Sequence, residues 1–339
     1  MKLEDIPEIF KSDSTELLRK LANTAKKTTE QYFGRAIGLY APLYISNYCE
    51  NLCVYCGFHS GNKLARKKLS PEDIEIECLA LSKTGIQNIL ILTGESRTAS
   101  PVSYIKESAS IAKRFFPNVS IEVYPLETEE YRDLYLAGVD GVTLYQETYD
   151  RERYAKLHLA GKKKDYDYRI NAIERIAESG IRHISMGILL GLSDWRKDIY
   201  ALYRHLDIIW RKYPGIEYSL SFPRLTKIND DTNSYFNVSD VDMLKIISTA
   251  RMLFPRVGIN LSTRESKSFR EKILEYGITK ISAGSKTSVG GYGRSEKKSK
   301  EMQFQVNDER SLAQIKSMLL RNGFDPVLTD WRGITNERI

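Results

Sequence analysis

Short apolar segments alternate along the chain with longer amphipathic segments. The apolar segments predict strands at Leu39–Ser46, Asn88–Thr93, Val119–Tyr124, Gly141–Gln146, His183–Ile188, Glu217–Phe222, Gly258–Ser262 and Thr279–Ala283. The amphipathic segments predict helices at Pro71–Thr84, Pro101–Phe115, Glu129–Leu136, Tyr166–Ser179, Trp195–Tyr213, Val241–Phe254, Lys267–Tyr276 and Ser311–Asn322. Short apolar strands are expected in a parallel sheet that is buried on both faces. The alternation predicts an α/β protein, a (β/α)8 TIM-type barrel. Its even spacing favours this barrel over an open doubly wound sheet.

The length of 339 residues fits one large barrel with short N- and C-terminal extensions. We expect an N-terminal helical extension over residues 1–35 and the barrel with its C-terminal cap over residues 36–339. Hydrophobic residues make up 42% and charged residues 28%, which is typical of a globular protein. The chain has no apolar run of about 18 residues, so we expect no membrane span. The N-terminus lacks a signal segment, which predicts a cytoplasmic protein.

The net charge of +7 comes largely from short basic clusters. They include Arg66-Lys67-Lys68, Lys162-Lys163-Lys164 and Lys297-Lys298. These clusters are spread along the chain and lack the interleaved aromatic residues of a nucleic-acid groove. We therefore interpret them as a solvated surface and expect no nucleic-acid partner.

Three cysteines, Cys49, Cys53 and Cys56, directly follow the first predicted strand. Three thiolates at this spacing favour a [4Fe–4S] cluster, because one iron then stays open for a ligand. The alternative is a zinc site with His59 as the fourth ligand. A disulfide does not suit a chain without a secretory segment. Cys78 lies on a predicted helix, where a buried structural role is expected.

Polar residues recur at the carboxyl ends of several predicted strands. They are found in Thr93-Gly94-Glu95-Ser96, Tyr145-Gln146-Glu147-Thr148, Ser221-Phe222-Pro223-Arg224, Ser262-Thr263-Arg264-Glu265 and Ser282-Ala283-Gly284-Ser285-Lys286. A single acidic residue at such a place is often only a helix cap. Their recurrence predicts an active site at this end of the barrel. Basic and acidic groups beside an open iron suggest amino-acid-like ligands.

The cysteine motif with Tyr55 before its last member resembles the signature of the radical S-adenosylmethionine (SAM) enzymes. Further segments resemble the tyrosine lyases within that group. They are Val142–Tyr149, His158-Leu159-x-Gly161-Lys162-Lys163, Gly191–Asp194, Ser219–Leu225, Leu261–Ser266 and Ser285–Tyr292. The chain is most similar to the 2-iminoacetate (dehydroglycine) synthases of thiamine thiazole biosynthesis. The resemblance runs from about residue 40 to Asp330-Trp331.

The resemblance implies a barrel of the radical SAM type and a carbon–carbon lyase. Such an enzyme cleaves the Cα–Cβ bond of L-tyrosine to 2-iminoacetate and p-cresol. It carries one [4Fe–4S] cluster, here on Cys49, Cys53 and Cys56, together with SAM. Reduced flavodoxin or ferredoxin is the implied electron donor, and thiazole synthase is an expected recipient of the labile imine.

By the same resemblance, Glu95 and the Gly94 backbone receive the ammonium group of SAM. Glu147 lies near the ribose, and Arg169 pairs with the SAM carboxylate, a task that suits a guanidinium. A surface ion pair of Arg169 is the alternative interpretation of that residue.

The remaining residues concern the adenine and the substrate. Tyr55 and the segment from Ile188 to Leu190 are expected to flank the adenine. Arg264 is expected to bind the tyrosine carboxylate, with Ser282 nearby. A structural salt bridge between Arg264 and its neighbour Glu265 is the alternative.

Several other functions stay open. A hydrogenase-maturation tyrosine lyase shares the barrel but adds a C-terminal domain with cysteines, whereas no cysteine follows Cys78 here. A tryptophan lyase is a second relative. Outside this group, the alternatives are a zinc-binding module and a cofactor-free hydrolase with Glu95 and Glu147 as paired carboxylates. His158 and His183 are expected to make structural hydrogen bonds.

Overall fold

Eight parallel strands close into a barrel, as the sequence predicts. The strands are β1 (Ala36–Ser46), β2 (Asn88–Thr93), β3 (Asn118–Glu122), β4 (Gly141–Glu147), β5 (His183–Ile188), β6 (Glu217–Ser221), β7 (Gly258–Leu261) and β8 (Lys280–Ser282). Each strand pairs with the next, and β1 pairs with both β2 and β8. This pairing closes the sheet into a (β/α)8 TIM-type barrel.

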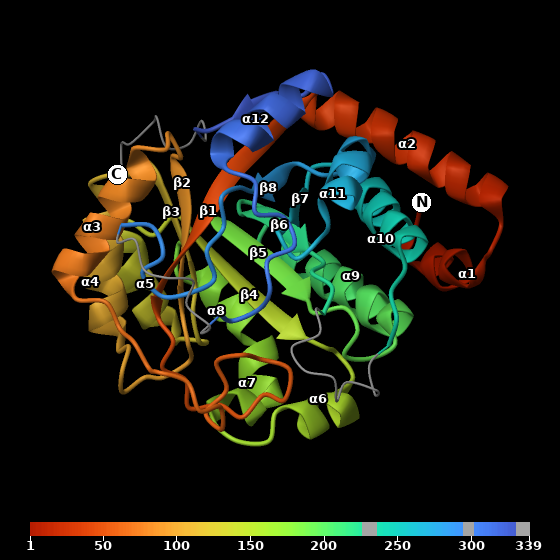
Figure 1. The fold of residues 1–339 in the computed structure, drawn as a ribbon. Coiled ribbons are helices and arrows are strands. Elements are labelled where there is room, and N and C mark those ends of the chain that lie inside the picture. Colours follow the sequence, from red (N-terminus) through yellow and green to blue (C-terminus); the bar gives the residue numbers. More distant parts are fainter. Residues whose placement is uncertain (226–235, 294–301, 330–339) are drawn as a thin grey trace.

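Helices surround the barrel in the computed structural model, which describes residues 1–225, 236–293 and 302–329 (Figure 1). They are α1 (Ile6–Lys11), α2 (Thr15–Phe33), α3 (Pro71–Ser82), α4 (Val102–Lys113), α5 (Thr128–Leu136), α6 (Arg151–Leu157), α7 (Tyr166–Ile170), α8 (Ala172–Glu178), α9 (Trp195–Lys212), α10 (Asp240–Leu253), α11 (Lys267–Ile273) and α12 (Leu312–Arg321). Short 3-10 helices are η1 (Leu3–Asp5), η2 (Lys162–Lys164) and η3 (Leu274–Tyr276). Lys297-Lys298 and Asp330-Trp331 lie outside the described residues.

The structure differs from the predicted elements in several places. A ninth strand, β9 (Asp325–Val327), pairs with the first residues of β1, which therefore begins three residues before its predicted start. A three-residue strand that contains Pro326 has almost no sequence signal. The predicted helix Tyr166–Ser179 is divided at Asn171 into α7 and α8. Helix α6 was not expected.

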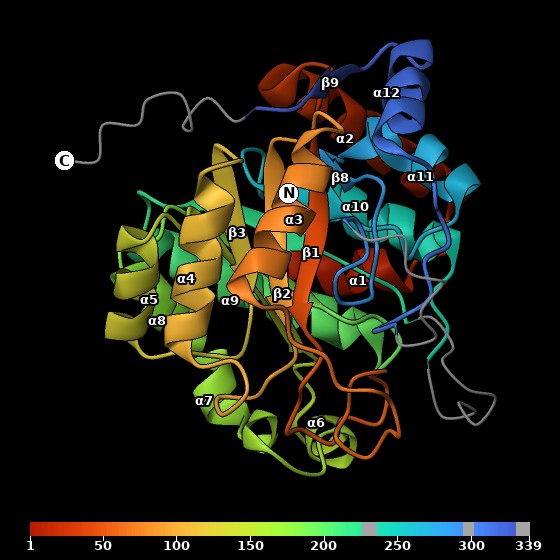
Figure 2. The ribbon, with the colours of Figure 1, turned by 60° about the vertical axis from the view of Figure 1, so that its left-hand side comes forward.

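The two ends of the barrel carry different elements (Figures 1 and 2). The loop that follows β1 lies with α6 and α7 at the carboxyl ends of the strands, and α2, α12 and β9 gather at the other end. None of the helices described here is long and apolar enough to cross a membrane.

Alternation along β3 shows how strands aim side chains into the barrel. Val119 and Ile121 are fully buried in the core between strands and helices. Asn118, Ser120 and Glu122 keep partial access to solvent and belong to the opposite face. Because successive residues of a strand point to opposite faces, Glu122 enters the barrel interior at the carboxyl end.

Candidate active site at the carboxyl end of the barrel

The three predicted cysteine ligands lie together on the loop after β1. Cys49, Cys53 and Cys56 line one cavity at the carboxyl end of the barrel. Burial raises the pKa of the Cys49 thiol to about 11, and nearby Glu95 adds to the rise. Burial also raises the pKa values of Cys53 and Cys56. The thiols are therefore protonated at neutral pH until a metal displaces the protons.

The arrangement of donors around this loop fits a cluster better than one zinc ion. Among the described residues, no three His, Cys, Asp or Glu side chains are placed to hold a metal ion together. His59 is not part of the cavity wall, and its Nδ1 accepts a hydrogen bond from the Gly61 N–H at 3.2 Å. Thiolates of a [4Fe–4S] cluster bind different irons and need not converge on one point. Cys78 is fully buried in the core, as expected.

Two glycines allow neighbouring loops to approach the cysteine loop closely. A Cβ atom at Gly94 would collide with the carbonyl oxygen of Tyr48. A Cβ atom at Gly161 would collide with the side chain of Asn51, and the φ of +84° at Gly161 also disfavours other residues. These contacts bring Glu95 and Lys163 beside the cysteines. The predicted role of the Gly94 backbone toward SAM stays a prediction.

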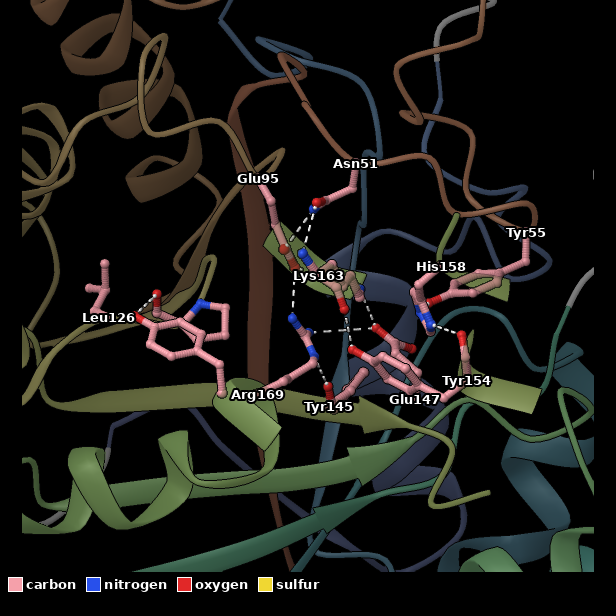
Figure 3. A network of polar contacts seen from close by, with 12 residues as sticks. Asn51, Tyr55, Glu95, Leu126, Tyr145, Glu147, Tyr154, His158, Lys163 and Arg169 are labelled. Carbon is pink, nitrogen blue, oxygen red and sulfur yellow. Dashed lines mark hydrogen bonds and ion pairs between the residues drawn. The ribbon is translucent and has the colours of Figure 1, made fainter. Parts of the chain in front are cut away.

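A buried network of charges occupies the same cavity wall (Figure 3). Arg169 Nη1 donates to Glu95 Oε1 at 3.0 Å, and Lys163 Nζ donates to Glu147 Oε1 at 2.6 Å. Each cation also lies near the second carboxylate, with Lys163 Nζ 3.6 Å from Glu95 Oε1 and Arg169 Nη2 3.7 Å from Glu147 Oε1. Asn51 joins the network by donating to Glu95 Oε2 at 2.8 Å and accepting from the Lys163 N–H at 3.0 Å.

Mutual pairing keeps all four groups charged. Burial by itself would raise the pKa of Glu95, but Arg169 and Lys163 outweigh it and hold the pKa at about 2. The pKa of Glu147 is lowered in the same way, against burial, by Lys163 and Arg169. Neither carboxyl group is then protonated at neutral pH, which gives the paired-carboxylate hydrolase no general acid. Arg169 is only 4% exposed, so the surface ion pair is the wrong interpretation.

The end of β4 has an unusual backbone. Glu147 is the one residue other than glycine with a positive φ in the described part of the chain, at 72°. The pairing of β4 with β5 shifts between Tyr145 and Glu147, and Arg169 Nε donates to the freed Tyr145 carbonyl at 2.7 Å. A positive φ is costly for a residue with a side chain and often marks a functional position. The bulge directs the Glu147 carboxylate toward Lys163.

Tyr55 and His158 form a buried pair beside this network. His158 Nδ1 lies 2.8 Å from the Tyr154 carbonyl oxygen and therefore carries the proton, so Nε2 accepts the hydrogen bond from the Tyr55 hydroxyl at 2.7 Å. Burial and nearby Lys163 lower the pKa of His158 to about 4, so the ring is neutral. This agrees with the expected structural role of His158. His183 lies at the opposite end of the barrel, with Nε2 3.0 Å from Ser219 Oγ.

The residues predicted to flank the adenine do not all face the cavity. Ile188 and Leu190 are buried in the main core, whereas Leu189 lines a cavity that adjoins the cysteine cavity and packs with Tyr55 in a smaller apolar cluster. Leu189 is therefore the best-placed residue of this segment for a contact with a ligand. The adenine contact itself stays a prediction.

Arg264 and Ser282 line a second cavity, which adjoins the first. Both cavities share wall residues, among them Cys56 and Glu147. The guanidinium carbon of Arg264 lies 3.6 Å from the centre of the Phe304 ring, and burial lowers the pKa of Arg264. Glu265 instead binds Arg224, whose Nε lies 3.0 Å from Glu265 Oε2. The structure therefore does not support a salt bridge between Arg264 and Glu265.

Three residues of the site are missing from the predictions: Asn51, Lys163 and Glu122. The basic run Lys162-Lys163-Lys164 predicts a solvated surface, yet the Lys163 side chain is 11% exposed and engaged in the network. Lys163 also ends a segment that resembles the tyrosine lyases, but that resemblance gives it no role. Glu122 could have been found, because it is the last inward-facing residue of β3. The strand had been expected to continue to Tyr124.

Comparisons with known proteins agree with this geometry. Residues 43–206 match the family described as radical SAM superfamily, and residues 221–325 match the biotin and thiamin synthesis associated domain. The chain is 36% identical to the 2-iminoacetate synthase of Salmonella typhimurium over 97% of this chain and 87% of that protein. The crystal structure of HydG, a maturase of the [FeFe]-hydrogenase, is 33% identical with a TM-score of 0.93, over 99% of this chain and 74% of that chain. Methylornithine synthase shares the fold, with a TM-score of 0.78 and 22% identity, over 96% of this chain and 94% of that chain.

Proposed function

The chain belongs to the radical SAM superfamily and, within it, to the 2-iminoacetate synthases, and from this premise we propose that it cleaves L-tyrosine at the Cα–Cβ bond. The proposed products are 2-iminoacetate and p-cresol. The observation that carries this proposal is the pair of adjoining cavities at the carboxyl end of the barrel. One contains the three cysteines and the charged network, and the other contains Arg264 and Ser282.

The first cavity suits the cofactors that the family uses. Cys49, Cys53 and Cys56 would hold a [4Fe–4S] cluster, whose thiolates bind different irons and so suit three thiols that do not converge on one metal ion in the described part of the chain. When bound, the reduced cluster and SAM supply a 5′-deoxyadenosyl radical that abstracts a hydrogen atom from the substrate. Glu95 and Arg169 present the opposite charges that the ammonium and carboxylate groups of SAM require.

Residues at the boundary of the two cavities would orient the rest of SAM. Glu147 would bind the ribose, because its carboxylate stays ionised and can accept hydrogen bonds from hydroxyl groups. Tyr55 and Leu189, which line the adjoining second cavity, would provide apolar surface for the adenine, and Ile188 and Leu190 would support Leu189 from the core. This packing also keeps water away from the reacting groups.

The second cavity suits an aromatic amino acid. Arg264 would bind the tyrosine carboxylate with its guanidinium group. Ser282 Oγ is buried without a hydrogen-bond partner among the described residues, so it has a bond to offer to a ligand. Aromatic wall residues Tyr40, Tyr44 and Phe304 would pack against the substrate.

The proposal includes partners and location. Reduced flavodoxin or ferredoxin would supply the electron, and thiazole synthase would take over the imine before water hydrolyses it. A cytoplasmic location would keep the cysteines reduced and available to the cluster. The division into an extension over residues 1–35 and a barrel over residues 36–339 belongs to the same proposal.

The resemblance to HydG provides the competing function. The test is anaerobic reconstitution with iron and sulfide, followed by SAM, dithionite and L-tyrosine. We expect p-cresol and glyoxylate, the hydrolysis product of the imine, in equal amounts and without carbon monoxide. Carbon monoxide in stoichiometric amounts would support the hydrogenase-maturation activity. Turnover of tryptophan in place of tyrosine would support a tryptophan lyase.

A further inference from the structure

Glu122 is a third carboxylate in the walls of the two cavities, beside Glu95 and Glu147. It is the last residue of β3, on the face of the strand that points into the barrel. Its side chain lines both adjoining cavities, so it lies at their boundary. A ligand group that binds Glu122 would therefore lie where the SAM and substrate sites meet.

The surroundings of Glu122 differ from those of the other two carboxylates in the cavities. Glu95 and Glu147 share the cations Arg169 and Lys163. Glu122 makes no hydrogen bond or ion pair with any of the residues that the structure describes. Burial, reinforced by nearby Glu147, raises the pKa of Glu122 to about 7. A half-buried carboxylate in this state would be stabilised by a cationic ligand.

The position of Glu122 is also complementary to that of Arg264. Strands β3 and β7 are four strands apart in a closed sheet of eight, so they form opposite walls of the barrel. Glu122 ends β3, and Arg264 follows β7. Both side chains line the second cavity. Besides Lys163 and Glu147, which pair with each other, the cavity presents a carboxylate on one wall and a guanidinium on the other, which matches the two charges of an amino-acid zwitterion.

We propose that Glu122 receives the α-amino group of the substrate while Arg264 holds its carboxylate. This inference rests on the proposed function, because it takes an amino acid as the substrate. The two contacts would place the Cα atom between the walls and turn the amino group toward the first cavity. Glu122 would then set the requirement for an α-amino acid, and the aromatic wall residues would set the preference for the ring.

The phenol group of tyrosine is the alternative partner for Glu122. A carboxylate in this cavity could accept a hydrogen bond from the phenol group of tyrosine instead of from its amino group. The two assignments make opposite predictions for ligands that lack one of these groups. L-Phenylalanine lacks the phenol hydroxyl, and 3-(4-hydroxyphenyl)propanoate lacks the amino group.

The test measures the affinity of these two ligands and of L-tyrosine by calorimetry. It uses the reconstituted protein with SAM and without a reductant, so that no turnover takes place. Glu122→Gln should lower the affinities for L-tyrosine and L-phenylalanine by the same factor, roughly 10- to 150-fold, which is the effect of losing one charge-assisted hydrogen bond. Binding of 3-(4-hydroxyphenyl)propanoate should stay the same or improve. Glu122→Asp should restore part of the lost affinity for both amino acids.

Matched controls separate binding from folding. Glu129→Gln removes an exposed carboxylate from the same βα unit and should change none of the three affinities. Iron content and SAM affinity should be unchanged in Glu122→Gln. Lost affinity for L-tyrosine but not for L-phenylalanine would assign Glu122 to the phenol and overturn the proposal. Equal effects on all three ligands, including no effect, would also overturn it. If the wild-type protein binds no L-tyrosine, the proposed function itself fails.

Discussion

The two adjoining cavities differ in how their charges are balanced before any ligand binds. In the first cavity, Glu95 and Glu147 are neutralised by Arg169 and Lys163, with Asn51 as an additional donor. The second cavity shares Glu147 and Lys163 with the first, but the half-buried Glu122 at their boundary makes no hydrogen bond or ion pair with the described residues, and Ser282 Oγ makes no hydrogen bond to them. The network of Glu95, Glu147, Arg169 and Lys163 is therefore satisfied before a ligand binds, whereas Glu122 and Ser282 still have bonds to offer to a ligand.

This difference suits two ligands with different tasks. A cofactor that must be held in one geometry gains from a rigid, satisfied network of polar groups. A substrate enters whole and leaves as two products. It gains binding energy from side chains that have no partner until the substrate pairs with them. Variants of the charged network and of Glu122 should therefore differ in their effects on stability and binding.

Loss of the shared metal centre should have the largest effect, because both cavities adjoin it. Cys49→Ala, Cys53→Ala and Cys56→Ala should each abolish the [4Fe–4S] cluster and all turnover, since each removes a thiolate that the cluster requires. Iron and sulfide content and the visible absorption spectrum measure this. Cys78→Ala is the control and should retain full iron content, because Cys78 lies in the core. Loss of the cluster in Cys78→Ala alone would show that the ligands are assigned wrongly.

Breaking the paired network should destabilise the fold strongly. Lys163→Met leaves Glu147 in a buried site without its closest cation, and such a loss typically costs about 3–5 kcal/mol. Anaerobic thermal unfolding of the reconstituted protein measures the effect. Lys162→Met is the matched control, because Lys162 is exposed, and it should change stability by no more than about 0.5 kcal/mol. Equal stabilities of the two variants would show that the network adds nothing to the fold.

The two cavities should also respond to pH with opposite signs. The pKa of Glu95 is lowered from 4.5 to about 2, so its stabilising effect is present above pH 4.5 and is lost as the pH falls toward 2. The pKa of Glu122 is raised from 4.5 to about 7, so stability is lost as the pH rises between these values. The stability of Glu122→Gln relative to the wild type should therefore increase by about 2 kcal/mol when the pH is raised from 5.5 to 8.

Melting temperatures of the wild type, Glu122→Gln and Glu95→Gln at these two pH values measure the difference. Glu95→Gln should be less stable than the wild type by a similar amount at both values, since Glu95 is ionised throughout. If the difference in melting temperature between Glu122→Gln and the wild type were the same at both pH values, the shifted pKa of Glu122 would be contradicted.

The sequence predicts those parts of the site that depend on local signals. The short apolar strands, the cysteine spacing and the polar residues at the strand ends locate the barrel and its open end, because each signal lies within a few residues. Arg169 and Arg264 were found through family resemblance and indeed line the two cavities. Their contacts with ligands stay predictions.

Long-range contacts account for what the sequence does not reveal. Lys163 reaches the site because Gly161 lets its loop pack against Asn51, a contact between residues more than a hundred positions apart. The shift of β4 that redirects Glu147 depends on its pairing with β5. Strand β9 exists only through its pairing with β1. None of these arrangements produces a local sequence pattern from which it could be predicted.

We expect the charged network around Glu95 and Arg169 to bind the ammonium and carboxylate groups of SAM, and Arg264 in the adjoining cavity to bind the carboxylate of tyrosine. A crossed measurement of affinities tests this assignment most directly, with Glu95→Gln and Arg264→Gln each titrated with SAM and then, at saturating SAM, with L-tyrosine. Glu95→Gln should weaken SAM by roughly 10- to 150-fold and leave tyrosine affinity within about twofold, whereas Arg264→Gln should do the reverse. If each variant weakened both ligands equally, or if Arg264→Gln weakened only SAM, the assignment of the two cavities would be wrong.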